Sequence, residues 1–304
     1  MSTTRPPVPD GRLVAFDRHR RLLFTVAYQM LGSVADAEDV VQDAWLRWSA
    51  DDRDDVADPR ADLVRTASRL ALDRLTAART RRETYVGPWL PEPLLTDEAD
   101  RGPEEAAELG EQVSLALLVV LETLSPVERA VFVLREVFGL PVAEVAAALG
   151  RSEAAVRQQA HRAREHVQAR RPRFATDRRT QREVTERFLA AAAGGDVEAL
   201  VALLAPDVVL VTDGGGRARA ALRPITGTDK VCRFLLATAA AGLELPDMRV
   251  DVAEVNGLTG IVAWTGGEPF LAISLTVTHG RVDQVLVVRN PDKLTGLGAP
   301  PSDT

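Results

Sequence analysis

One segment of the chain, residues 124–171, limits the fold more than any other. It reads LSPVERAVFVLREVFGLPVAEVAAALGRSEAAVRQQAHRAREHVQARR. Ser125, with Glu128 three positions later, has the pattern of a capping box at a helix N-terminus. A short helix rich in small residues then ends at Gly150, and Ser152 begins a longer helix after a tight turn. This spacing predicts a helix-turn-helix.

The last helix of this segment is predicted to have an apolar inner face and a basic outer face. Arginine suits guanine edges and phosphates, and glutamine suits adenine edges, so the outer face favours DNA contact. Between positions 151 and 182 there are ten arginines and three acids. A merely solvated basic helix is the alternative, but the turn pattern argues against it. The candidate DNA-binding residues here are Arg151, Ser152, Arg157, Gln158, His161 and Arg162.

The N-terminal part is also predicted to be helical, with two helices of opposite charge. Apolar residues recur at helical spacing over 12–50, interrupted at Gly32-Ser33, and a third helix is expected over about 60–82. The helix within 32–49 carries acids and tryptophans on its surface, whereas the helix within 63–83 is rich in arginine. One acidic and one basic helix suit two different partners.

A linker rich in proline and acids is expected at 87–105.

The character of the chain changes after residue 173. Beyond 173, one or two helices lead into alternating apolar segments separated by Asn256-Gly257, Gly266-Gly267 and His279-Gly280, which favour hairpin turns. A further helix is expected at about 228–241. This pattern indicates an α+β domain with a mostly antiparallel sheet.

Composition excludes several classes. The chain has 304 residues, 46% of them hydrophobic, which predicts two or three folded domains rather than a disordered chain. No apolar run is long enough to span a bilayer, and the N-terminus has no apolar signal core, so we expect a cytoplasmic protein without a membrane partner. Cys232 is the only cysteine, and the four histidines form no metal-binding set, so neither a metal nor a cofactor is expected.

Taken together, these segments resemble an extracytoplasmic-function (group-four) sigma factor of bacterial RNA polymerase. DAEDVVQDAWLR resembles the region-2 helix that binds the polymerase clamp, and LVRTASRLALDRL the helix that captures the unpaired −10 strand. Residues 124–168 resemble region 4, which reads the −35 element and touches the polymerase flap. The resemblance implies clamp binding by Asp36, Glu38, Asp39, Gln42, Asp43, Trp45 and Leu46, and binding of single-stranded promoter DNA by Arg65, Arg69, Arg74, Arg79, Arg81 and Arg82.

Three further motifs resemble the sigma-factor subgroup that carries a fused SnoaL-like C-terminal domain, a cone fold. They are WLPEP in the linker, DGGGR after an apolar run, and NPDKL near the end. The resemblance implies that they form an interdomain regulatory contact. Its residues are Trp89, Leu90, Pro91, Glu92, Pro93, Asp213, Gly214, Gly215, Gly216, Arg217, Asn290, Pro291, Asp292, Lys293 and Leu294.

The glycine triplet does not fit a phosphate-binding loop, because it lacks both the P-loop and the dinucleotide-loop spacings. We interpret it instead as a bend that exposes Asp213 and Arg217, followed by another strand in RARAAL.

The fold class expected is therefore two all-α domains, sigma regions 2 and 4, followed by an α+β SnoaL-like cone with a curved antiparallel sheet. The expected boundaries are 12–86 for region 2, 87–108 for the linker, 109–172 for region 4, 178–294 for the SnoaL-like domain and 295–304 for a flexible tail.

The function expected is promoter recognition as a subunit of core RNA polymerase, under the control of the fused domain, by a protein that is monomeric when free. A small apolar ligand in the concave cone is a further expected partner. Two alternatives stay open. One is a one-component ligand-sensing repressor; the other is a cyclase or isomerase with a DNA-binding appendage, using cavity residues among Asp207, Asp213, Asp229, Asp251, Trp264 and His279. Catalysis is not expected.

Overall fold

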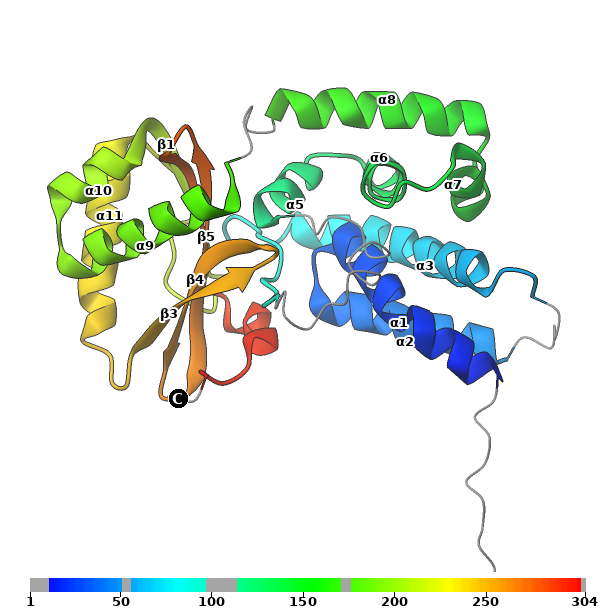
Figure 1. The fold of residues 1–304 in the computed structure, drawn as a ribbon, viewed down its shortest axis with the longest axis horizontal. Helices are drawn as coiled ribbons and strands as arrows, with labels where there is room; N and C mark the ends of the chain where they lie inside the picture. The colour runs from blue at the N-terminus through cyan, green and yellow to red at the C-terminus, as the bar shows by residue number, and fades with distance from the viewer. Residues whose placement is uncertain (1–10, 51–55, 97–113, 171–175, 302–304) are drawn as a thin grey trace, which may run out of the picture. The chain divides into compact units, whose positions relative to one another are not determined.

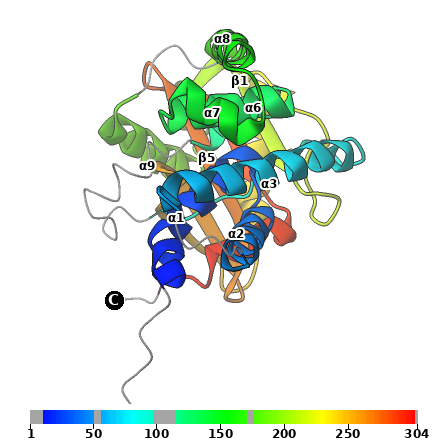
Figure 2. The ribbon, with the colours of Figure 1, turned by 90° about the vertical axis from the view of Figure 1, so that its right-hand side faces the viewer.

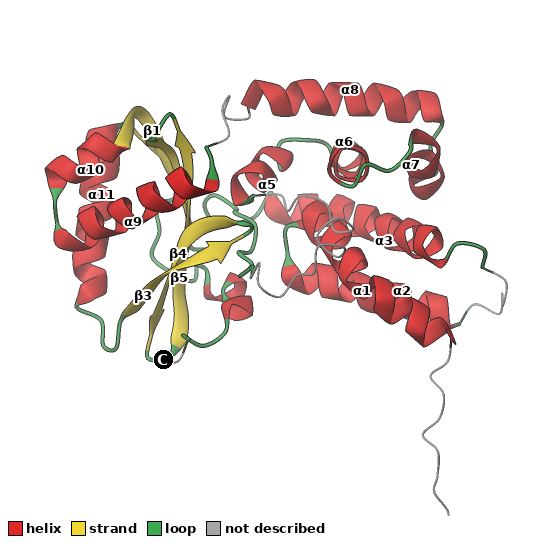
Figure 3. Cartoon of the chain, viewed as in Figure 1, coloured by secondary structure: helices red, strands yellow, loops and turns green. Residues whose placement is uncertain are grey.

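The computed structural model describes residues 11–50, 56–96, 114–170 and 176–301, and these residues form two compact units (Figure 1). The described residues of the first unit are those of 11–78 and 124–165; those of the second are 79–96, 114–123 and 166–301. Helices make up the first unit, and all the described strands lie in the second (Figure 3). None of the described helices is long and apolar enough to cross a membrane.

The first unit begins with three helices, α1 (Gly11–Leu31), α2 (Val34–Ser49) and α3 (Pro59–Arg82). Ser33 caps α2 as the sequence predicts, because its hydroxyl accepts a hydrogen bond from the Asp36 amide at 3.2 Å. Trp48, predicted to lie beside the acids, instead packs inward at 7% exposure, and its indole nitrogen donates to the Arg12 carbonyl oxygen at 3.1 Å. This contact holds the start of α1 against the end of α2.

The helix-turn-helix follows in the same unit, in α6 (Pro126–Phe132), a π turn (Val133–Val137), α7 (Val142–Leu149) and α8 (Glu153–Arg170). The predicted capping box of Ser125 and Glu128 is present. Gly150 ends α7 with a φ of 62°, a left-handed conformation that glycine adopts without strain. Both views show α6 and α7 between α3 and α8 (Figure 2).

The second unit contains one six-stranded sheet, in the order β2-β1-β6-β5-β4-β3. The strands are β1 (Leu204–Asp213), β2 (Ile225–Thr226), β3 (Arg249–Val255), β4 (Leu258–Thr265), β5 (Glu268–Thr278) and β6 (Arg281–Val288). The three predicted hairpin turns connect β3 through β6. The sheet is antiparallel except for the pair of β1 and β6, which is parallel, so it is mixed.

The two faces of this sheet are covered by different parts of the chain. One face packs under α9 (Arg178–Gly194), α10 (Val197–Leu203) and α11 (Thr228–Leu243), around Phe188, Leu203 and Val231. The other face, with Val262, Trp264 and Val288, packs against Leu90 of the linker and Leu115 of α5 (Leu115–Leu121). The sheet thus joins its own helices to the linker and to α5, both of which precede it in the chain.

Two sequence expectations are wrong. Residues 217–222 form turns rather than a strand. The segment expected to be a flexible tail begins with a 3-10 turn (Thr295–Leu297) whose Leu297 is 2% exposed, and the Gly298 carbonyl accepts a hydrogen bond from Trp264 at 3.0 Å. Apolar burial explains the second, because the linker, α5 and the tail share one core with the sheet, in the same compact unit.

Candidate functional sites

Helix α8 presents the outer face that the sequence predicts. Val156, Ala160 and Ala163 are buried, whereas all six candidate DNA-binding residues of this segment are exposed or project outward: Arg151, Ser152, Arg157, Gln158, His161 and Arg162. Arg157 pairs with Glu153 at 2.5 Å, and both side chains are about half exposed or more. Such a surface pair is worth little, so the guanidinium is available to a partner.

Helix α2 presents an acidic face with an apolar end. Glu38, Asp39, Gln42 and Leu46 are exposed, and Leu46 is 57% exposed. Trp45 is half-buried, with its ring centroid 5.0 Å from that of Phe16. Asp36 and Asp43 are partly exposed. Exposed apolar area next to acids is a common mark of a protein interface.

The arginines of α3 are less accessible than the sequence suggests. Arg74 forms ion pairs at 2.8 Å with both Asp39 and Asp43, so the structure brings together residues predicted to bind different partners. Arg65 pairs with Asp62. Arg79 is exposed, the side chain of Arg81 lies outside the described residues, and Arg82 pairs with Glu122 while its guanidinium carbon lies 3.6 Å from the centre of the Trp89 ring.

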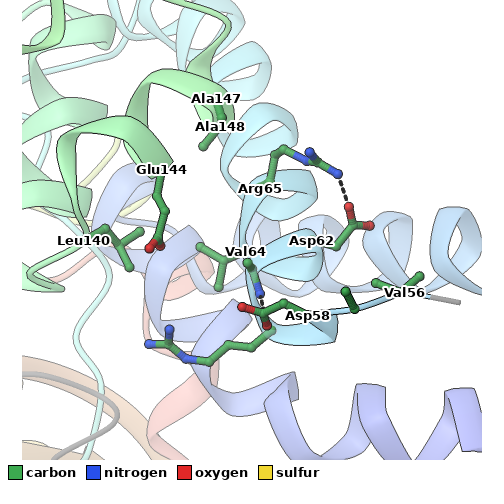
Figure 4. Close-up of a pocket in the computed structure, with 12 residues that line it drawn as sticks. Val56, Asp58, Asp62, Val64, Arg65, Leu140, Glu144, Ala147 and Ala148 are labelled. Carbon is green, nitrogen blue, oxygen red and sulfur yellow. Dashed lines mark hydrogen bonds and ion pairs between the residues drawn. The ribbon is translucent and has the colours of Figure 1, made fainter. Parts of the chain in front are cut away.

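Arg69 joins α3 to the helix-turn-helix. Its Nε and a terminal nitrogen donate to the carbonyl oxygens of Ala148 and Ala147, at 2.9 and 2.8 Å. These are carbonyls of the last turn of α7, where the helix dipole favours a cation. Beside this contact lies a cavity of about 320 Å³, lined by the start of α3 and by Leu140, Glu144 and Ala147 (Figure 4). Val56 and Asp58, from the segment before α3, also line this cavity, and residues 51–55 lie outside the described part of the chain.

A buried polar cluster, which we call the Asp213 cluster, forms where the linker meets the sheet. It consists of Tyr85, Trp89, Leu90, Asp213, Asn290 and Lys293. The Asp213 carboxylate is fully buried and accepts hydrogen bonds from the Tyr85 hydroxyl at 2.6 Å, the Leu90 amide at 2.8 Å and the Lys293 ammonium at 2.7 Å. The expectation that the glycine bend exposes Asp213 is therefore wrong, because its charge is held inside by three donors.

The rest of the cluster satisfies Lys293. Its ammonium group donates to the Leu90 carbonyl oxygen at 2.5 Å and lies 4.0 Å from the centre of the Trp89 ring, a cation–π contact. Burial lowers the pKa of Lys293 to about 8, although the Asp213 carboxylate favours its charged form. Asn290 donates to the Tyr85 hydroxyl at 2.9 Å.

Two of the three glycines in DGGGR allow a close approach, Gly214 to the turn that follows it and Gly215 to this cluster. A Cβ on Gly214 would lie 2.3 Å from the Ala218 carbonyl oxygen. A Cβ on Gly215 would lie 2.3 Å from the Asn290 amide nitrogen and 2.6 Å from the Tyr85 hydroxyl, and its φ is 56°. Arg217, by contrast, is exposed and lies 3.4 Å from Asp292, also exposed. Gly215 therefore allows the backbone to approach the cluster.

The linker continues from the cluster along the edge of the sheet. Pro91 and Pro93 are buried, and Glu92 is partly exposed. The amides of Thr96 and Asn256 donate to the carbonyl oxygens of Glu254 and Leu94, at 2.9 and 2.8 Å. Pro291 is exposed, but Leu294 is 2% exposed. WLPEP, DGGGR and NPDKL thus meet, a juxtaposition that the resemblance implied and spacing alone does not give.

Tyr85 gives the cluster a pH signature. Burial, and then the bond to Asp213, raise the pKa of Tyr85 well above its ordinary value of 10. The folded state therefore keeps the phenol proton that the unfolded state loses above about pH 10, and this stabilisation is fully present below that pH and is lost as the pH rises through the raised pKa. We expect the difference in unfolding free energy between the wild type and Tyr85→Phe, measured in urea, to shrink as the pH rises from about 9.5 to about 11.5. A difference that stays constant would contradict this assignment.

The other face of the sheet encloses a cavity of about 140 Å³ under α9 and α11. Its lining is mostly apolar, with Phe188, Phe234, Ile261 and Ile273 among its members. The polar side chains that line it are Thr212, Arg219, Thr238 and Arg289; within the described part of the chain no Asp, Glu or His does so. None of the six acid–base candidates of the sequence lines it, and two of them, Asp213 and Trp264, contribute to the opposite face.

Comparisons with known proteins agree with this architecture. Residues 15–81 match the family model "Sigma-70 region 2", residues 114–167 match "Sigma-70, region 4", and residues 185–290 match "SnoaL-like domain". The ECF RNA polymerase sigma factor SigJ of Mycobacterium tuberculosis is 44% identical over 92% of this chain and 92% of its own length. The chain belongs to the ECF RNA polymerase sigma factors.

Two further comparisons support the assignment. The probable ECF RNA polymerase sigma factor SigI of Mycobacterium tuberculosis is 32% identical to this sigma factor, over 95% of this chain and 97% of its own. The crystal structure of Mycobacterium tuberculosis SigJ superposes with a TM-score of 0.75 at 40% identity, covering 93% of this chain and 98% of that one. The region-4 match begins at residue 114, so α5, which packs on the sheet, is part of region 4 of this sigma factor. Membership of the ECF sigma-factor family rejects the alternative of a one-component repressor.

Proposed function

We propose that this sigma factor binds core RNA polymerase and promoter DNA through its helical regions, and that the SnoaL-like domain controls both by holding the linker between them. The observation that carries the proposal is the Asp213 cluster. It fixes the segment that follows region 2 inside the second unit, and α5 of region 4 packs on the same sheet. Any change in this anchoring alters the freedom of both regions. Run-off transcription with purified core polymerase, comparing wild type with cluster variants, tests it.

The exposed face of α2 is proposed to bind the polymerase clamp. Region 4 is proposed to contact the polymerase flap. The residues proposed for the clamp contact are Asp36, Glu38, Asp39, Gln42, Asp43, Trp45 and Leu46. Asp39 and Asp43 are paired with Arg74, so the polymerase competes with an internal ion pair. An exposed pair of this kind contributes about 0–1 kcal/mol, a small obstacle.

Leu46 offers the simplest test of this interface. Burying an exposed leucine contributes about 1.5–3 kcal/mol, so Leu46→Asp is expected to weaken binding to core polymerase about tenfold or more. Thermal stability is expected to stay unchanged, because the side chain is 57% exposed. Fluorescence anisotropy of the labelled sigma factor, titrated with core polymerase, measures the binding affinity of each variant. Val201→Asp, an exposed apolar position on α10, is the matched control. An equal loss of affinity for core polymerase in both variants, or no loss in Leu46→Asp, would show that α2 does not form the interface.

The promoter contact is proposed for α3 with the −10 strand and for α8 with the −35 element. Arg69 reaches DNA only after it leaves the carbonyl oxygens of Ala147 and Ala148. The arrangement in the first unit is therefore proposed to be a free form that opens when the polymerase binds. The protein is further proposed to be cytoplasmic, to be monomeric when free, and to have no catalytic activity. The cavity lined by Ile261 and Ile273 is proposed to hold a small apolar ligand.

A further inference from the structure

The cavity of the SnoaL-like domain has one charged side chain set into its apolar wall. Along the sheet, Val250 pairs with Ala263, and Ala263 with Leu271. Extending the register of Ala272 with Val288 by one position places Arg289 opposite Leu271. These four residues line the cavity as one row across four strands, while Ile261, Ile273 and Val287 line it one row away. The strand period of two therefore directs Arg289 to the cavity face.

Arg289 is half-buried, and among the described residues its guanidinium has no acidic partner. Its Nε is buried without a hydrogen-bond acceptor, and no carboxylate in the described ranges pairs with it. Its guanidinium carbon lies 4.0 Å from the centre of the Phe270 ring, so the ring orients the charge without neutralising it. Burial lowers its pKa, with no opposing acid. Arg219, exposed, lines the same cavity and adds a second positive charge.

An unpaired cation in an apolar cavity points to an anionic ligand, because arginine forms its strongest hydrogen bonds with planar carboxylates. The size of the cavity limits the rest of the molecule. An engineered cavity of about 150 Å³ holds one benzene ring, and this cavity measures about 140 Å³. We propose that the cavity binds a small carboxylic acid with a single ring or a short apolar chain, and that Arg289 is its counter-ion. This deepens the proposed function, on which it rests, by naming the ligand class.

The position of Arg289 connects this site to the linker. The Arg289 amide donates to the Asp213 carbonyl oxygen at 2.7 Å, and the Asn290 amide donates to the same oxygen at 2.9 Å. Asn290 in turn donates to Tyr85. The side chain that meets the ligand and the residues that hold the linker are therefore neighbours on one strand end. A ligand that shifts Arg289 shifts the backbone of the Asp213 cluster.

Fluorine NMR on the full chain tests the ligand class with two probes of nearly equal shape, fluorobenzoate and fluorobenzyl alcohol. We expect fluorobenzoate to bind about tenfold more tightly, the effect of one charge-assisted pair. Arg289→Met is expected to remove this preference while the alcohol still binds. Arg233→Met, an exposed arginine of α11, is the matched control and is expected to keep the preference. Ala263→Leu, which fills the cavity beside Arg289, is expected to weaken the binding of both probes. This variant keeps the test valid if Arg289→Met fails to fold.

Three results would overturn the proposal: equal affinity of the wild type for both probes, no binding of either, or a preference that survives in Arg289→Met. Run-off transcription with the same protein separates this failure from that of the proposed function. Promoter-directed transcripts without acid binding reject the ligand and leave the sigma-factor role intact. Acid binding without any effect of cluster variants on transcription rejects the regulatory role and leaves the ligand site.

Discussion

Replacing Asp213 with alanine is expected to lower the free energy of unfolding of the second unit by about 3–5 kcal/mol, the usual effect of removing one partner from a buried ion pair. The reason is the burial of what remains. Lys293 is 7% exposed and would lose the carboxylate that favours its charged form, and the Leu90 amide and Tyr85 hydroxyl would lose their acceptor. Urea unfolding followed by tryptophan fluorescence measures the change, because Trp89 and Trp264 both lie in this unit.

The linker is expected to detach in the same variant. Chymotrypsin cleaves after aromatic residues, so Tyr85 and Trp89 report directly whether the linker has left the sheet, and cleavage there is expected to accelerate. In transcription assays the variant is expected to differ strongly from the wild type, since the linker no longer restrains the regions on either side of it. Glu268→Gln is the matched control, because Glu268 is an exposed acid at the start of β5 and belongs to neither the linker nor the cluster.

A second variant separates charge from shape. Asp213→Ala combined with Lys293→Met removes both ionisable groups and is expected to recover part of the lost stability, since the single change leaves a buried amine without its carboxylate partner. If the single variant lost less than about 1 kcal/mol, the cluster would not anchor the linker. The same conclusion would follow if linker cleavage were unchanged.

The sequence predicts well what local chemistry decides. The caps at Ser33 and Ser125, the left-handed glycine at 150 and the three hairpin turns follow from preferences of a few neighbouring residues, and each is present. The inward and outward faces of α8 likewise follow from helical periodicity. These features depend little on where the rest of the chain lies.

What the sequence could not predict depends on partners that are distant along the chain. The Leu90 amide bonds Asp213 across 123 positions, and no local pattern distinguishes a buried aspartate after a strand from an exposed one. The resemblance assigns Arg74 and Asp43 to different partners, and nothing local shows that α2 and α3 place them together. One signal was available for Lys293. The chain has only two lysines among 37 basic residues, and a compact ammonium suits a narrow buried site that a planar guanidinium does not.

Arg289 escapes sequence reasoning for a related cause. It follows an apolar strand, and its periodicity with Val287 places it on the cavity face, yet sequence alone does not show that a cavity is there. The acid–base candidates follow from residue type, whereas the cavity is lined by arginine, threonine and apolar groups. Predicting which side chains line this cavity therefore requires the register of the sheet.

Removing Arg157 and Arg162 together is expected to lower the affinity of the holoenzyme for promoter DNA about a hundredfold, because each specific arginine contact contributes about 1–3 kcal/mol. Both side chains are exposed on α8, so the fold is expected to be unaffected. The double alanine variant is compared with the wild type by footprinting on a promoter duplex that the wild-type holoenzyme selects from a randomised pool.

The salt dependence of this loss tells how the two arginines act. If they contact phosphates, the slope of affinity against salt concentration falls by about one per lost contact, and all sequences weaken alike. If they read bases, the slope changes less and discrimination between sequences falls. Arg179→Ala, an exposed arginine of α9 paired on the surface with Glu183, is the control and is expected to leave promoter affinity unchanged. Helix α8 combines a helix-turn-helix position with a basic outer face. Unchanged footprints in the double variant would nevertheless show that these two arginines do not make the −35 contact.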